Sequence, residues 1–208
     1  MKITENQINV EFQIDILYTI PSDGKEQLVA MDEFLLDAGY TYYAAPKVET
    51  DAFLVADVTG WEDVHLLAGK ANIFFEGNYI GQSHIDPKAT GDTLRVSFGR
   101  DNKVNIKREL LKDFTSKKFI ATNKKETFAY EISVKNTKSQ NIKIEIEDQV
   151  PVSNNSQITI EAEEISNAEY NKETGKLKWK FELAPAESKQ VRLIYAVKYP
   201  KNKIIAGL

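Results

Sequence analysis

The stretch Phe128-Ala129-Tyr130-Glu131-Ile132-Ser133-Val134-Lys135 decides the fold, because large apolar residues alternate in it with small or polar ones. Successive side chains of a β-strand point to opposite faces of the sheet, whereas an amphipathic helix repeats its apolar positions every 3.6 residues. The stretch therefore predicts a strand with one face in a core and the other in water.

Four further segments of the C-terminal half repeat this period of two. Turn-rich segments such as 151–156 and 171–175 separate them. Strands at this spacing, each with one polar face, are what two antiparallel sheets packed face to face require. We therefore predict an immunoglobulin-like or fibronectin-like β-sandwich, with Trp179 as its core aromatic residue. The four alternating segments are 142–147, 158–163, 177–183 and 191–197.

The N-terminal half also predicts strands. Apolar residues alternate from Ile8 to Ile20, apart from Leu17, and Pro21-Ser22-Asp23-Gly24 then supplies a turn. The segment Gln27 to Ala38 fits either one helix face or a strand, and its brevity and β context favour the strand. Further strands are predicted at 41–46, 52–58, 93–98 and 103–111, the last with a short helix as the alternative.

A β-hairpin is predicted from Ala71 to Gly81. Apolar residues flank Gly77-Asn78, and these two residues suit the positive φ of a tight II′-like reversal.

A polar, lysine-rich passage from Asp113 to Asn123 predicts a domain boundary. The expected fold class is all-β with two antiparallel sandwich-like domains: a sandwich or barrel-like domain at 1–113 and an immunoglobulin-like sandwich at 114–208. The first part carries 11 Lys/Arg against 19 Asp/Glu, and the second carries 16 against 12. This split indicates two units with different surfaces, and it is too weak a basic balance for a nucleic-acid partner.

Composition places the chain among globular proteins, with 42% hydrophobic and 28% charged residues. No apolar run approaches the roughly 20 residues of a membrane helix, so no membrane-spanning segment is expected. The first residues lack the apolar core of a signal peptide. The absence of cysteine excludes disulfides and thiolate chemistry.

The search for chemistry-bearing motifs yields no catalytic residue, no metal site and no cofactor. His65 and His84 are the two histidines, and His65 has only Asp63 nearby as a second ligand, short of the three or four that zinc needs. No nucleophile elbow, P-loop or dinucleotide fingerprint occurs. Carboxylates are plentiful, but a glycosidase pair or a calcium loop is not recognisable from their spacing.

Three aromatic residues are the candidate ligand-binding residues: Tyr40, Tyr42 and Trp61. Tyr40 and Tyr42 share one strand face, where exposed rings could stack on a sugar. The alternative is that these rings pack in a core or between domains.

Several segments, in their order along the chain, resemble the C-terminal domain of the mucoidy inhibitor A-like family, a domain of unknown function. The resemblance extends from about Phe12 to Pro200. The segments that carry it are 52–56, Trp61, 66–74, 77–81, Gly99-Arg100-Asp101, Val134-Lys135-Asn136, 148–152 and Lys178-Trp179.

The resemblance implies a C-terminal piece of a longer protein, located in the bacterial envelope or periplasm, and it brings no catalytic residues. We therefore expect a non-catalytic structural or protein-interaction module. Its partners would be other proteins or N-terminal regions of a longer chain, bound at strand edges or in a groove between domains. A carbohydrate-binding or carbohydrate-active protein is the alternative, with a glycan as the partner.

Overall fold

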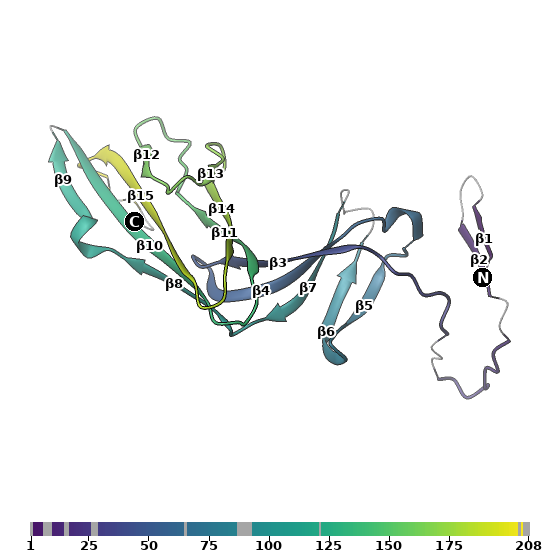
Figure 1. Ribbon diagram of the computed structural model, residues 1–208. Helices are drawn as coiled ribbons and strands as arrows, with labels where there is room; N and C mark the ends of the chain where they lie inside the picture. The colour runs from purple at the N-terminus through teal and green to yellow at the C-terminus, as the bar shows by residue number, and fades with distance from the viewer. Residues whose placement is uncertain are drawn as a thin grey trace. The chain divides into compact units, whose positions relative to one another are not determined.

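The computed structural model describes residues 2–5, 10–14, 17–25, 29–64, 66–86, 93–120, 122–203 and 205. These residues belong to two compact units, Met1–Asp37 and Ala38–Leu208. Regular structure in the described residues is strand, apart from two single 3-10 turns, η1 (Glu62–Val64) and η2 (Lys112–Phe114) (Figure 1). The predicted all-β class is confirmed, and most of the strand pairs are antiparallel.

In the first unit, β1 (Lys2–Glu5) pairs antiparallel with β2 (Val10–Gln13). The predicted strand from Ile8 to Ile20 is therefore shorter than expected: residues 17–20 are exposed and outside any strand, while 8, 9, 15 and 16 lie outside the described residues. The predicted strand at 27–38 is wrong for residues 29–37, which form none. Leu35 in that segment is 98% exposed, so no apolar face is buried there to stabilise a strand.

One large sheet of the second unit is centred on β10 (Asn123–Asn136). This strand pairs with β15 (Ser188–Pro200) along almost its whole length. Its other edge pairs first with β9 (Ser116–Ile120) and then with β8 (Val104–Leu110). The strand β12 (Thr159–Glu164) pairs with β15 and completes the sheet, in which all pairs are antiparallel.

The other large sheet has six strands and one parallel pair. Tyr42 lies opposite Ile144 where β3 and β11 run parallel, and the other neighbours in this sheet are antiparallel. The strands, in spatial order, are β13 (Glu169–Tyr170), β14 (Lys176–Leu183), β11 (Ile142–Gln149), β3 (Ala38–Ala45), β4 (Glu49–Val58) and β7 (Leu94–Arg100).

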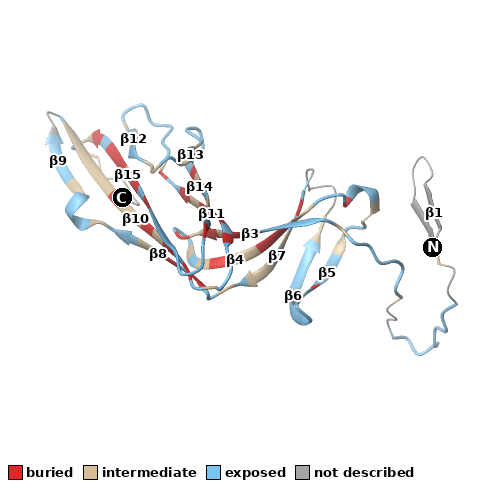
Figure 2. Cartoon of the chain, viewed as in Figure 1, coloured by how far each residue is buried: buried red, intermediate tan, exposed pale blue. Residues whose placement is uncertain are grey.

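Residues of both large sheets form one hydrophobic core (Figure 2). Ile132 and Leu193 come from the sheet of β10, and Ile144 and Leu177 come from the sheet of β11. The predicted core role of Trp179 is confirmed: the ring is 4% exposed, and its indole N–H donates to the Ile165 carbonyl at 2.9 Å. Alternating side chains thus give each sheet apolar residues that contribute to this core.

A hairpin of β5 (Gly69–Phe75) and β6 (Asn78–Ile85) lies beside β7. The predicted hairpin is confirmed, but its turn is one residue earlier than expected. Glu76 and Gly77, with φ of 49° and 79°, are the two turn residues, which is the type I′ pattern of a two-residue reversal.

The strands on either side of residue 113 share both large sheets. β8 pairs with β10, and β3 pairs with β11, so the predicted division into 1–113 and 114–208 does not follow the sheets. The division of the structure falls instead after Asp37. The polar passage that suggested a boundary contains η2 and β9, which stay close to β10.

Candidate functional site

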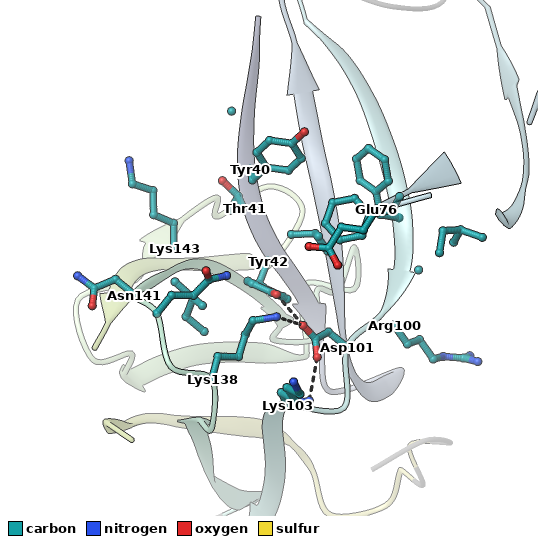
Figure 3. A pocket seen from close by; sticks show the side chains of 18 of the residues that line it. Tyr40, Thr41, Tyr42, Glu76, Arg100, Asp101, Lys103, Lys138, Asn141 and Lys143 are labelled. Atoms are coloured by element: carbon teal, nitrogen blue, oxygen red, sulfur yellow. Dashed lines mark hydrogen bonds and ion pairs between the residues drawn. The ribbon is translucent and has the colours of Figure 1, made fainter. Parts of the chain in front are cut away.

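A hollow of about 740 Å³ lies where β3, β7 and the β5–β6 hairpin approach the segment that connects β10 to β11. Figure 3 shows the side chains around it, with Tyr40 and Tyr42 on β3, Glu76 from the hairpin, and Asp101 and Lys138 at its base. We name this feature the Tyr40 hollow. It combines an aromatic wall with a charged base, as ligand pockets commonly do.

The aromatic wall consists of rings from three strands. Tyr40 of β3 is 53% exposed, and its ring centroid lies 6.0 Å from that of Phe98 on β7. The ring centroid of Phe75, at the end of β5, lies 5.2 Å from that of Phe98. Both pairs are tilted, which is a favourable geometry for neighbouring rings.

The base of the hollow is a hydrogen-bonded cluster of three side chains. The Tyr42 hydroxyl donates to the Asp101 carboxylate at 2.7 Å, and Lys138 forms an ion pair with the same oxygen (Figure 3). The other carboxylate oxygen accepts the backbone N–H of Lys103 at 2.9 Å. Both oxygens of Asp101 are therefore engaged.

Turns at the ends of the sheets position this cluster. Asp101 lies between β7 and β8, where the chain passes from one large sheet to the other, and its backbone N–H donates to the Ala52 carbonyl at 2.9 Å. Lys138 follows β10, and its backbone N–H donates to the side chain of Asn136 at 2.9 Å. Asn136 is fully buried and fixes that turn.

The electrostatics keep every member of the cluster in its ordinary charge state. Burial acts to raise the pKa of Asp101, but hydrogen bonds from Lys138 and Tyr42 outweigh it, so this pKa is lowered. Burial acts to lower the pKa of Lys138, and the bonds to Asp101 and Tyr42 raise it overall. Burial raises the pKa of Tyr42. A general acid or base works best with a pKa near the working pH, and these shifts move all three groups away from neutrality.

Most other charged residues near the hollow are paired, but within the described residues the side chains of Glu76 and Lys103 are not. Arg100 forms ion pairs with Glu49 and Asp51, and Asp57 forms a two-contact pair with Arg95 at 2.7 and 3.0 Å. The carboxylate of Glu76 makes no hydrogen bond or ion pair within the described part of the chain. A ligand would therefore meet Glu76 as a free acceptor.

The structure separates the three predicted site residues. Tyr40 lines the hollow with an exposed ring; Tyr42 lines it too, but is 4% exposed and turned to Asp101. Trp61 is 8% exposed and does not line the hollow. Its indole nitrogen has no hydrogen-bond partner in the described residues. The three rings do not form one stacking platform.

Sequence reasoning missed Phe98, Asp101 and Lys138 as site residues. Asp101 belongs to the segment Gly99-Arg100-Asp101, which was quoted for the family resemblance, but no sequence pattern linked it to Lys138, 37 residues later in the chain.

His84 is exposed on β6, and His65 lies outside the described residues. Within the ranges that the structure describes, no three His, Asp or Glu side chains are grouped to hold a metal ion, and no helix is long and apolar enough to cross a membrane.

The fold defines this chain as an all-β protein of several mainly antiparallel sheets. It belongs to the family described as "Domain of unknown function (DUF4139)", whose model matches residues 2–201. It is similar to "Protein F37C4.5" of Caenorhabditis elegans, with 25% identity over 220 residues that cover 98% of this chain. The chain spans 39% of the length of that relative. No solved structure gives a significant match.

Proposed function

We propose that this chain is a non-catalytic structural and protein-interaction module of a bacterial envelope protein of the mucoidy inhibitor A-like type. Its two large sheets would form an immunoglobulin-like β-sandwich that supports the hairpin as a recognition element. The envelope location and the mucoidy inhibitor A-like assignment are drawn from the sequence resemblance alone.

The observation that carries this proposal is the exposed aromatic surface of the hairpin. Phe74 on β5 is 60% exposed and Tyr79 on β6 is 55% exposed, and their ring centroids lie 5.4 Å apart. Aromatic residues are enriched at protein–protein interfaces, and contiguous exposed apolar patches mark such interfaces.

The partner is a protein surface that presents apolar side chains to this pair of rings. The longer relative has more than half of its length outside the matched region, which supports a partner within the same polypeptide or its assembly. The charged base of the Tyr40 hollow also supports binding over catalysis, because Asp101 and Lys138 are held in their ordinary charge states.

Photo-crosslinking in cells tests the proposal. A photoreactive phenylalanine at position 74 should capture a defined protein, whereas the same group at the exposed Lys172 should not. Purified partner should then bind the chain in calorimetry, and Phe74→Ser with Tyr79→Ser should weaken that binding at least about tenfold. Equal affinity of the wild type and this double variant would refute the hairpin as the interface.

A glycan in the Tyr40 hollow is the second candidate, favoured by the exposed Tyr40 ring beside the free Glu76 carboxylate. A glycan array run with and without calcium would detect it. Binding should be lost in Tyr40→Ala and kept in Phe74→Ser. Tyr42 and Trp61 are unsuitable test positions, because both are buried and their substitution would disturb folding.

A further inference from the structure

A second hollow, of about 910 Å³, lies along β8 and the neighbouring faces of β10 and β15. The side chains concerned alternate with core residues, so they lie on the face of the sheet that points away from the core. We name this set the polar grid. It consists of Asn105, Lys107, Ser133, Lys135, Ser188 and Gln190.

Strand register arranges the polar grid in two rows. In one row Lys135 of β10 lies between Asn105 of β8 and Ser188 of β15. In the next row Ser133 of β10 lies between Lys107 of β8 and Gln190 of β15. Neighbouring strands lie about 4.8 Å apart, so the two lysines are diagonal neighbours roughly 7–8 Å apart at the backbone.

The six side chains are uncommitted. None makes a hydrogen bond or an ion pair within the described part of the chain. The two carboxylates that line the hollow are already paired, because Asp51 lies 2.8 Å from Arg100 and Asp101 is bound to Lys138. Lys107 and Lys135 therefore give the grid two positive charges that form no ion pair within the described part of the chain.

The positive area is bounded on one side. The next row along the same face contains Glu109, Glu131 and Arg192, and Glu131 pairs with Arg192 at 3.4 Å. The anionic group of a ligand would therefore lie over the two lysines and not over this row.

We propose that the polar grid binds an acidic saccharide. The two lysines would hold a carboxylate group, while the amides and hydroxyls of the other four residues would pair with sugar hydroxyls, since each can donate and accept. Val104, Ile106 and Val134 also line the hollow, but they are buried in the core, so the grid presents polar side chains to a ligand. This inference is independent of the hairpin interface and of the Tyr40 hollow.

Calorimetric titration of the intact chain with an oligogalacturonate tests the inference. Neutral maltohexaose and polyglutamate serve as the comparison ligands. The chain should bind the oligogalacturonate, with affinity that falls as salt rises. The double variant Lys107→Gln, Lys135→Gln should bind about tenfold more weakly or worse. The double variant Lys70→Gln, Lys112→Gln removes the same charge from exposed sites elsewhere and should bind like the wild type.

A second pair of variants separates saccharide recognition from charge alone. Asn105→Ala with Gln190→Ala keeps both lysines, and it should weaken oligogalacturonate binding while leaving the melting temperature unchanged. Equal affinity for polyglutamate and the oligogalacturonate would overturn the saccharide assignment. The proposal would also be overturned if the chain did not bind the oligogalacturonate. The same holds if the Lys107→Gln, Lys135→Gln variant and the Lys70→Gln, Lys112→Gln variant lost equal amounts of affinity.

Discussion

The guanidinium of Arg108 on β8 lies 2.7 Å from the carboxylate of Asp148 on β11, so an ion pair joins the two large sheets inside the protein. The side chain of Asp148 is fully buried and that of Arg108 is 14% exposed. Arg108 also lies over the Tyr130 ring, 3.7 Å from its centroid, on the same sheet. The pair fixes one sheet against the other at a single defined place.

Asp148→Ala should lower the free energy of unfolding by about 3–5 kcal/mol, because it leaves the Arg108 charge buried without a partner. Urea denaturation measures the change. The double variant Arg108→Met, Asp148→Leu removes both charges and should recover most of the loss. If the single and double variants were equally unstable, the loss would come from packing and not from the unpaired charge.

Asn136→Ala should destabilise the end of the molecule where Asp101 and Lys138 meet. The Asn136 amide donates to the carbonyls of Gln140, Leu183 and Ala184 at 2.9, 3.2 and 3.0 Å. Because the substitution leaves buried carbonyls without a donor, it should lower the free energy of unfolding by about 1–3 kcal/mol. Thermal unfolding should show this loss, and Asn154→Ala at an exposed position should show almost none.

Gly175→Ala should cost more than Gly60→Ala, although both glycines have a positive φ, of 73° and 71°. A Cβ at Gly175 would lie 2.2 Å from the Val150 carbonyl oxygen, whereas one at Gly60 would meet open space. Gly60→Ala should therefore lower the free energy of unfolding by only about 1–2 kcal/mol, the cost of placing a residue with a Cβ at a positive φ. Chemical denaturation of the two variants side by side tests this, and equal losses would argue against the close approach.

Acid should weaken the fold partly through Asp101. Its pKa is lowered in the folded protein, so its ionised form stabilises the fold above the pKa of an unfolded aspartate. That contribution is lost as the pH falls through the lowered folded value. The free energy of unfolding, measured from pH 7 down to pH 3, should fall less steeply in Asp101→Asn than in the wild type. Parallel curves would exclude Asp101 as a contributor.

The strands of the second unit could be predicted from sequence because each has a long alternating pattern. Phe128 to Lys135 lies in β10, and Trp179 lies in the core, as expected. Alternation tells which face of a strand is buried, but it does not tell which strands are neighbours. For this reason the parallel pairing of Tyr42 with Ile144 was not foreseen, nor was the sharing of both sheets across residue 113.

The candidate site was harder to predict because its residues come together only through those pairings. Tyr42 and Asp101 are 59 residues apart in the chain, and Tyr43 and Glu147 are 104 apart. Spacing along a sequence cannot reveal such contacts. Tyr40 and Tyr42 were predicted to share one strand face, but the Tyr40 ring is exposed and the Tyr42 ring lies in the hydrophobic core.

The pairing of β10 with β15 also has a consequence for the timing of folding during synthesis. β10 ends at Asn136, whereas β15 begins only at Ser188, so a ribosome must add dozens of residues before the partner exists. During that interval the edge of β10 that will receive β15 is open to strands of other nascent chains. Slow translation between these strands would lengthen the exposure, and a chaperone that shields extended segments would have its greatest effect there.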